Sequence, residues 1–337
     1  MRAVGYRNPL PITDPEALID VDLPDPTPNP RDVLVRVKAV SVNPVDVKVR
    51  AKVAPPQGEV RVLGFDAAGV IEAVGSDTSL FKPGDEVYYS GSIARQGTDA
   101  EFHVVDERIV GRKPASLTFP QAAAMPLTTI TAWELLFHRL GVPAGDKSAK
   151  GTLLVINGAG GVGSILIQLA RQLTGLTVIA TASRPESRAW ASDMGAHLVI
   201  HHQRPLNEAL VDAGFASVDL VASLTATEHH WPAIAEAIAP EGRIAVIDDP
   251  KQLDIVPFKR KSVSLHWEFM FTRPVFETND MIEQHNLLNK AAALFDDGVL
   301  RHTMKEDFGP INAANLRRAH AHQESGKAIG KSVLTGF

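Results

Sequence analysis

The stretch that decides the fold is Thr152–Gly163, which reads Thr-Leu-Leu-Val-Ile-Asn-Gly-Ala-Gly-Gly-Val-Gly. An apolar run leads into it, and Val162–Leu173 has the apolar spacing of a helix. The glycines match the pattern G-x-G-x-x-G, which is weak alone but specific between a strand and a helix. We therefore interpret this turn as a binding site for the pyrophosphate of a dinucleotide, because N–H groups at a helix start attract phosphate. The expected contacts are Gly158, Gly160, Gly161, Val162 and Gly163.

Strand-like and helical segments alternate around this turn. The strand-like segments are Thr152–Ile156, Thr177–Ala182, Val218–Ala222 and Arg243–Ile247, and a second helical segment is Glu186–Met194. Such alternation predicts an α/β fold with a doubly wound parallel sheet. Residues that follow the strand ends should reach the cofactor, and here they are Ser223, Thr225 and Ile247.

The end of the second strand indicates which dinucleotide is bound. Sites that prefer NAD place an acid there, about 20 residues beyond the glycines, to bind the ribose hydroxyls. This chain has Ser183 and Arg184 instead, and Glu186 lies past the turn. A serine and an arginine can hold a 2′-phosphate, so we predict NADPH as the cofactor. An exposed turn residue is the structural alternative for Arg184.

The residues before position 126 have a different pattern. The segment Asp32–Asn43 alternates valines with polar residues, which is typical of a strand. Shorter strand-like segments follow at Gly69–Val74, Glu86–Tyr89 and Glu101–Val105, and glycines separate them. Many short strands predict a partly open β-barrel.

The end of the chain should return to this barrel domain. It contains a predicted helix at Met281–Phe295 and strand-like segments at Val299–Thr303 and Ser332–Leu334. We therefore place a barrel domain at residues 1–126, completed by 274–337, and a dinucleotide-binding domain at 127–273.

Composition excludes several function classes. The chain has 337 residues, no cysteine and a formal net charge of −5 at pH 7. Without cysteine there can be no disulfide, thiolate catalysis, cysteine-ligated zinc or iron–sulfur cluster. A negative net charge argues against nucleic acid as a partner. No apolar run approaches the ~20 residues of a membrane helix, and the first residues lack a secretory signal, so we expect a cytoplasmic protein with no membrane partner.

Taken together, the order of motifs resembles the medium-chain dehydrogenase/reductase superfamily, and most closely its zinc-free quinone oxidoreductase and zeta-crystallin branch, which includes a "zinc-type alcohol dehydrogenase-like" subgroup. The resemblance spans nearly the whole chain. Besides the glycine turn, it rests on Asn43-Pro-Val-Asp46, Gly64-Phe-Asp66, Gly69–Gly75, Lys82–Val87, Ala122–Pro126, Thr131-Ala-Trp133 and Gly195-Ala196.

This resemblance implies a GroES-like domain followed by a nucleotide domain, with the active site in the cleft between them. It implies NADPH-dependent reduction of quinones or α,β-unsaturated carbonyls (enones), often by a homodimer. Residues on matching positions are expected as follows: Asn43, Asp46 and Asp66 near the substrate, Thr131 at the nicotinamide, His202 near the adenosine phosphate, and Lys331 beside the cofactor. One of the neighbouring tyrosines Tyr88 and Tyr89 is expected to face the pocket and donate a proton or a hydrogen bond, with Tyr89 as the candidate. The structural alternatives are a turn-stabilising amide for Asn43, core packing for Tyr89, a surface-loop histidine for His202 and a solvated lysine for Lys331.

The resemblance also marks a departure. Zinc-dependent relatives hold catalytic zinc through Cys, His and Cys, and the matching positions here are Asn43, Phe65 and Leu127. Phenylalanine and leucine cannot ligate zinc, so we expect no catalytic zinc site. A conjugated acceptor then suits the chemistry, because reduction spreads the developing charge and hydrogen-bond donors suffice to stabilise it.

Three alternative functions have different sequence requirements. A zinc alcohol dehydrogenase requires three protein ligands for its catalytic zinc, and this chain lacks two of them. A short-chain dehydrogenase needs Tyr-x-x-x-Lys, and the residues four positions after Tyr6, Tyr88 and Tyr89 are Leu10, Ser92 and Ile93. A non-catalytic NADPH-binding protein would share the glycine turn, so only turnover separates it from a reductase.

Overall fold

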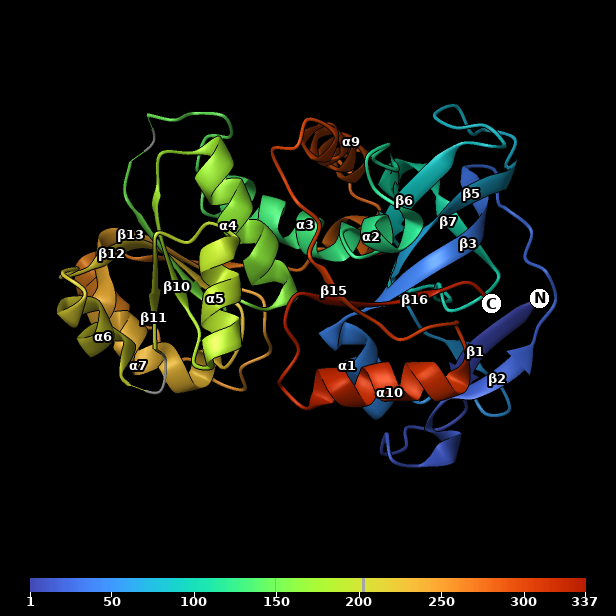
Figure 1. Cartoon of the computed structure of the whole chain (residues 1–337), viewed down its shortest axis with the longest axis horizontal. Helices are drawn as coiled ribbons and strands as arrows, with labels where there is room; N and C mark the ends of the chain where they lie inside the picture. The colour runs from blue at the N-terminus through green and yellow to red at the C-terminus, as the bar shows by residue number, and fades with distance from the viewer. Residues whose placement is uncertain (149, 202–203) are drawn as a thin grey trace. The chain divides into compact units, whose positions relative to one another are not determined.

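Figure 1 shows the computed structural model of the chain, which describes residues 1–148, 150–201 and 204–337. The chain divides into two compact units. Unit 1 comprises Met1–Ile130 and Phe271–Phe337, and unit 2 comprises Thr131–Met270. Within the described ranges, no helix is long and apolar enough to cross a membrane. The predicted cofactor residue His202 lies outside the described residues.

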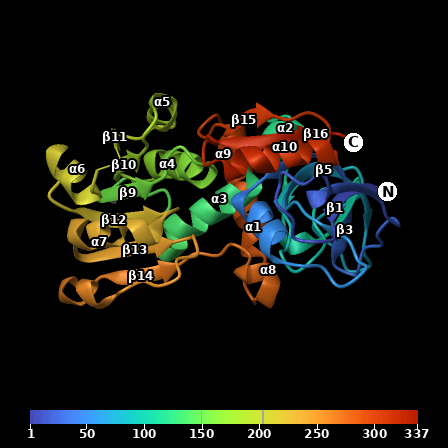
Figure 2. The same ribbon diagram turned by 90° about the horizontal axis from the view of Figure 1, so that it is seen from below.

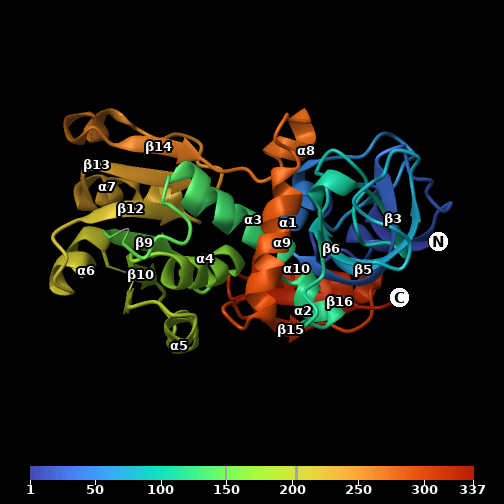
Figure 3. The same cartoon turned by 90° about the horizontal axis from the view of Figure 1, so that it is seen from above.

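Unit 2 is built on a parallel sheet. Its strands are β9 (Thr152–Ile156), β10 (Thr177–Thr181), β11 (Leu198–Ile200), β12 (Val218–Ser223), β13 (Ile238–Val246) and β14 (Ser264–Trp267). Their order is β11-β10-β9-β12-β13-β14, and Figures 2 and 3 show β14 at one edge. This order diverges from β9 in both directions, which is the doubly wound arrangement, so the predicted fold class is confirmed.

Apolar strands explain the core of unit 2. Leu154, Ile179 and Val221 are buried on neighbouring strands, as expected for a parallel sheet covered on both faces. Trp231 and Ile234 of α7 pack against them. The helices of this unit are α4 (Gly161–Leu173), α5 (Pro185–Asp193), α6 (Leu206–Asp212) and α7 (Thr227–Ala237), and a π-helical segment covers Glu134–Arg139.

Unit 1 is organised around the long strand β3 (Asp32–Val42). It pairs antiparallel with β5 (Asp66–Val74) along most of its length. Its first half also pairs with β7 (Phe102–Asp106), and its second half pairs with β16 (Lys331–Thr335). Figure 1 shows β16 beside β3, so a segment from the far end of the sequence completes this unit.

The other elements of unit 1 extend this sheet or cover it. Its further strands are β6 (Glu86–Ser90), β8 (Val110–Arg112) and β15 (Met304–Asp307), and a separate sheet holds β1 (Arg2–Tyr6), β2 (Ile19–Asp22) and β4 (Arg61–Val62). Its helices are α1 (Pro44–Lys52), α2 (Phe119–Ala123), α8 (Thr272–Phe276), α9 (Glu283–Asp296) and α10 (Ala313–Glu324), and α3 (Pro126–Trp133) runs from unit 1 into unit 2.

One predicted strand is wrong. The segment Val299–Thr303 is not a strand, and β15 begins only at Met304. The reason lies in the end of α9, because the backbone N–H groups of Val299 and Leu300 both donate to the Leu294 carbonyl oxygen. These residues close the helix and cannot pair with a neighbouring strand.

A buried histidine lies where α1 packs against α10. The side chain of His320 is 1% exposed, and neither of its ring nitrogens has a hydrogen-bond partner among the described residues. Burial lowers its pKa to about 3, and the nearby positive charge of Arg50 adds to this effect. The guanidinium of Arg50 is also buried, and it donates to the Leu10 carbonyl oxygen and to Glu324.

This histidine should make unit 1 sensitive to acid. Below pH 6.5 the unfolded chain protonates His320 and the folded chain does not, so stability falls as pH falls towards 3. Relative to wild type, the unfolding free energy of His320→Leu should rise by about 1.4 kcal/mol for each pH unit below about 6. Urea unfolding of both proteins at several pH values measures this difference. The contributions of the other titrating groups are the same in both proteins and therefore cancel. A pH-independent difference would show that His320 is not buried as a neutral ring.

Candidate functional site

Unit 1 contains a buried polar cluster around the first residue of β5. We call it the Asp66 cluster, and its members are Ser41, Asn43, Asp46, Asp66 and Lys331. Both oxygens of the Asp66 carboxylate are bound. Oδ1 accepts from the Leu127 backbone N–H at 2.7 Å, and Oδ2 accepts from the Ser41 hydroxyl at 2.9 Å. Because the side chain is fully buried, these bonds replace its hydration.

Asn43 and Asp46 come from the start of α1. Asn43 is the N-cap, and its backbone N–H donates to Asp46 Oδ2 at 2.7 Å, which fixes the first turn of the helix. The Asn43 amide nitrogen donates to Asp66 Oδ2 at 2.8 Å and to the Ser41 carbonyl oxygen at 3.4 Å. Burial raises the pKa of Asp46 to about 7.

Lys331 joins this cluster from the first residue of β16. Its ammonium donates to the Val42 carbonyl oxygen at 2.9 Å, to the Asn43 amide oxygen, and to Asp66 Oδ2 at 3.2 Å. Its side chain is 3% exposed. Burial lowers the pKa of Lys331, and the nearby carboxylates of Asp66 and Asp46 oppose this effect.

The Asp66 cluster brings three predicted substrate residues together with a predicted cofactor residue. Asn43 is fully buried, and both ends of its amide are bonded to other members of the cluster. Sequence reasoning placed Lys331 beside the cofactor and gave no sign of its pairing with Asp66. The two residues are 265 positions apart in the chain.

Tyr89 lies on β6, and its hydroxyl bonds to His103, which is not a member of the Asp66 cluster. The hydroxyl is 3.0 Å from His103 Nδ1, and His103 Nε2 is 3.1 Å from the Gln96 carbonyl oxygen. A carbonyl only accepts, so Nε2 carries the proton and Nδ1 accepts from Tyr89. Burial lowers the pKa of His103 to about 4 and raises that of Tyr89. This geometry corresponds to the core-packing alternative for Tyr89.

The cluster does not fit catalytic zinc. The Asn43 amide oxygen already accepts from Lys331, and a cation there would repel a metal ion. Phe65 is 2% exposed and packs edge-on against Phe271, with ring centroids 5.1 Å apart. Leu127 offers only an apolar side chain. Phe65 and Leu127 therefore supply no ligand atom, and the Asn43 amide oxygen and Asp66 Oδ2 are already bonded to Lys331, so a tetrahedral zinc site is incomplete.

In unit 2, the glycine turn joins β9 to α4. A β-carbon on Gly163 would lie 2.3 Å from the Asn157 carbonyl oxygen and 2.8 Å from the Gly158 α-carbon, so only glycine fits there. The helix begins at Gly161, and the first N–H groups of a helix have no partner within it. These groups are suited to bind a pyrophosphate, so the turn fits a dinucleotide.

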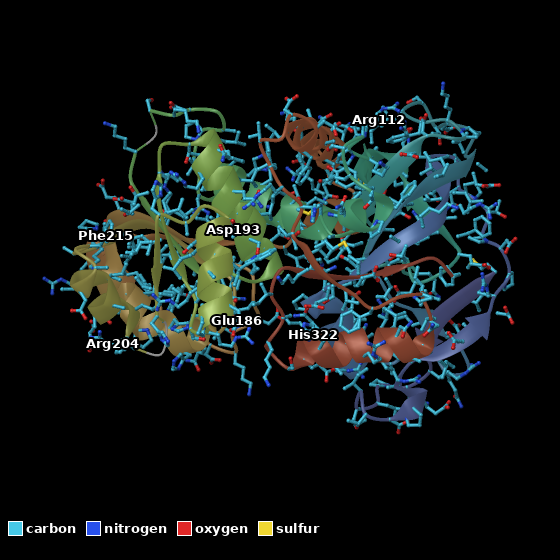
Figure 4. All side chains as sticks on the ribbon, in the orientation of Figure 1. Arg112, Glu186, Asp193, Arg204, Phe215 and His322 are labelled. Carbon is cyan, nitrogen blue, oxygen red and sulfur yellow. The ribbon has the colours of Figure 1, made fainter. Side chains whose placement is uncertain are left out.

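The predicted 2′-phosphate residues follow β10. Ser183 is half-buried, and Arg184 is the N-cap of α5, where its backbone N–H donates to the Ser187 hydroxyl at 3.2 Å. No carboxylate stands between β10 and α5. Figure 4 labels Glu186 in the first turn of α5 and Asp193 at the other end of this helix.

The ends of β12 and β13 meet at the same edge of the sheet as the glycine turn. Ser223 pairs with Ile156 and with Val246 in register, so the three strands end together. The Ser223 hydroxyl is 2.7 Å from the Thr227 hydroxyl, which in turn donates to Asp248. Sequence reasoning named Ser223 and the end of β13 and missed Thr227, which lies five residues after the predicted strand Val218–Ala222.

The other predicted cofactor residues lie at this edge or on α3. Thr225 is exposed in the loop after β12, and the Ile247 backbone N–H donates to the Ser223 carbonyl oxygen at 3.3 Å. Thr131 lies on α3 and is 4% exposed.

Comparison with known proteins agrees with the fold of both units. Residues 29–116 match the alcohol dehydrogenase GroES-like domain, and residues 161–284 match the zinc-binding dehydrogenase model. A zinc-type alcohol dehydrogenase-like protein of Staphylococcus epidermidis is 37% identical over 336 residues, which cover 99% of each chain. The crystal structure of a Rhizobium etli protein named as a zinc-dependent alcohol dehydrogenase has 56% identity and a TM-score of 0.95, and the match covers 100% of this chain and 98% of that one.

A plant relative matches over about half of each chain. The NADPH-dependent alkenal/one oxidoreductase of Arabidopsis thaliana chloroplasts is 37% identical over 194 residues, which cover 53% of this chain and 47% of that protein.

A GroES-like domain joined to a doubly wound sheet with a dinucleotide turn defines a nicotinamide-dependent oxidoreductase. The chain belongs to the medium-chain dehydrogenase/reductase superfamily.

Proposed function

We propose that the protein is an NADPH-dependent reductase of α,β-unsaturated carbonyls or quinones that works without zinc. The chemistry of the Asp66 cluster carries this proposal: a carboxylate, an amide and an ammonium are bonded to one another, and the apolar Phe65 and Leu127 stand beside them. Without a metal to polarise an isolated carbonyl, a conjugated acceptor is the better substrate, since its developing charge is delocalised.

Selectivity for NADPH is proposed from the residues after β10. Ser183 and Arg184 stand where NAD-preferring proteins place an acid, and they can bind the 2′-phosphate. The Arabidopsis relative named as NADPH-dependent supports this choice of cofactor.

Removing the Arg184 side chain should therefore weaken the binding of NADPH but not that of NADH. A charge-assisted hydrogen bond contributes roughly 1.5–3 kcal/mol, so Arg184→Ala should raise the Kd for NADPH about tenfold or more. The Kd for NADH should hardly change, because NADH has no 2′-phosphate. Fluorescence titration with both cofactors measures the effect, and Arg260→Ala, at an exposed arginine elsewhere in unit 2, is the matched control. Equal weakening of both cofactors would contradict the assignment.

In this reaction the protein has to bind the cofactor and orient the acceptor. NADPH held by the glycine turn would supply the hydride, and the proton that completes the reduced product would come from solvent. The first turn of α4 would hold the pyrophosphate, and we propose that Thr131 would orient the nicotinamide. We propose that Asn43, Asp46 and Asp66 set the shape and polarity of the region that receives the carbonyl, because their mutual bonds leave little freedom to move.

Turnover by the protein after EDTA treatment tests the proposed function. NADPH oxidation would be followed spectroscopically with a panel of quinones and enones, with NADH in parallel and with the metal content measured. We expect saturable turnover of a conjugated acceptor, faster with NADPH. Tight NADPH binding without turnover of any acceptor would favour a non-catalytic role. Activity that requires one zinc ion per chain would favour an alcohol dehydrogenase.

A homodimer is proposed through the edge strand β14. Among the described residues β14 pairs with β13 only. Its last residue, Trp267, is 56% exposed, and Phe269, two residues further along the chain, is 48% exposed. Two copies that pair their β14 strands about a twofold axis would cover both aromatic side chains. Light scattering should give twice the chain mass of 36.3 kDa, and Trp267→Lys should give the single mass. A wild-type mass of one chain would rule the dimer out.

A further inference from the structure

We propose that Lys331 is the resident cation of the Asp66 cluster: its ammonium fills a cation position lined by oxygen atoms, and so takes the place of a metal ion. This inference rests on the proposed zinc-free function and deepens it. Lysine is one of the least commonly buried residue types unless it is paired, so a buried lysine at the end of a strand requires an account.

The contacts of the ammonium are complete. It has three N–H donors, and three acceptors surround it: a backbone carbonyl oxygen, an amide oxygen and a carboxylate oxygen. The acceptors come from Val42, Asn43 and Asp66, so the end of β3, the start of α1 and the start of β5 converge on one point. Carbonyl and carboxylate oxygens of this kind are the ligands that hard cations take in proteins.

A second carboxylate reinforces this position. Asp46 is 1% exposed, and its Oδ1 has no hydrogen-bond partner among the described residues. Its carboxylate favours the charged form of Lys331, and the charge of Asp66 raises the pKa of Asp46. Without the ammonium, two buried carboxyl groups would share a site with no counter-charge, which is strongly unfavourable.

The same geometry argues against Lys331 as a ligand of the cofactor phosphate. All three N–H groups are used inside unit 1, and the side chain is 3% exposed. Lys331 is therefore a positioning residue, because it acts by fixing the orientation of the Asn43 amide and the Asp66 carboxylate. A lysine cannot be lost by dialysis or chelation, so the site carries its cation permanently.

Four variants test the assignment: Lys331→Met, Lys331→Ala, Asp66→Asn and the double variant Lys331→Met/Asp66→Asn. Lys327→Met, at an exposed lysine four residues earlier, is the matched control. The first readout is thermal unfolding. Lys331→Met should lower the Tm, and the double variant should be more stable than the sum of the two single changes predicts, because both members of a pair are removed together. Additive effects would overturn the proposal.

The second readout is metal binding. Mn²⁺ should raise the Tm of Lys331→Ala, because truncation leaves an oxygen-lined cavity beside Asp46 and Asp66, and it should not change the Tm of wild type or Lys327→Met. No response of Lys331→Ala to Mn²⁺, or stoichiometric zinc bound by wild type, would overturn the proposal.

The third readout is NADPH affinity, which a cofactor ligand would change. Lys331→Met should bind NADPH as wild type does, whereas its kcat should fall if the oriented cluster serves turnover. Weakening of NADPH binding equal to that of Arg184→Ala would assign Lys331 to the cofactor and overturn the proposal. The wild type can bind its cation as proposed and still reduce no acceptor. If the double variant is non-additive and Lys331→Ala responds to Mn²⁺, but the wild type reduces no acceptor, then the proposed function is wrong and the assignment of Lys331 as the resident cation is supported.

Discussion

Asp66→Ala should lower the free energy of unfolding by about 3–5 kcal/mol, because it leaves the buried ammonium of Lys331 without its carboxylate. The change also removes the acceptors of the Leu127 backbone N–H and the Ser41 hydroxyl. Urea unfolding followed by circular dichroism measures the loss. The effect should fall on unit 1, so NADPH affinity should be retained under conditions in which the variant is folded.

An isosteric change provides the control for this prediction. Asp66→Asn keeps an oxygen for the Leu127 N–H and loses only the charge and one acceptor, so it should cost less than the alanine variant. If Asp66→Ala shifts the unfolding free energy by less than about 0.5 kcal/mol, as an ordinary surface change does, the carboxylate is not paired in the interior.

Gly163→Ala should nearly abolish NADPH binding and destabilise unit 2. The new β-carbon would lie 2.3 Å from the Asn157 carbonyl oxygen, and backbone atoms cannot rotate away as a side chain can. Overpacking of this kind costs about 1–3 kcal/mol or more. The shifted helix start would also lose two or more charge-assisted bonds of about 1.5–3 kcal/mol each, so the Kd for NADPH should rise at least about 100-fold.

A neighbouring glycine gives the matched comparison. A β-carbon on Gly160 would meet the Asn157 side-chain amide at 2.8 Å, and this amide can turn away. Gly160→Ala should therefore destabilise unit 2 less than Gly163→Ala does, as measured by thermal unfolding without cofactor. Equal stability of Gly163→Ala and wild type would show that α4 does not pack closely on the turn.

The sequence predicted those elements whose pattern is local. The strand β9 has the predicted limits Thr152–Ile156, and α4 begins one residue before the prediction. The strands β11 and β14 were missed, since Leu198–Ile200 and Ser264–Trp267 are too short to show a period. Their place in the sheet is determined by pairing with β10 and β13, which a local pattern does not contain.

The residues of the candidate site show the same difference between local patterns and long-range pairing. The glycine turn could be predicted because strand, turn and helix are consecutive in the chain. The partner of Lys331 could not be predicted, because only the pairing of β16 with β3 brings Lys331 to Asp66, which lies 265 residues earlier in the chain. The resemblance to a family indicated that Lys331 matters and gave a different reason for it. Only the three contacts of the ammonium show what it binds.

The order of β3 and β16 along the chain has a consequence for synthesis. A ribosome makes β3 and Asp66 first, then the whole of unit 2, and only afterwards Lys331. During that interval one side of β3 lacks β16 and the carboxylate lacks its counter-ion, although unit 2 can already fold. The nascent protein therefore has an open sheet edge for which chaperones can compete, and the arrival of β16 covers this edge and neutralises the charge in one step.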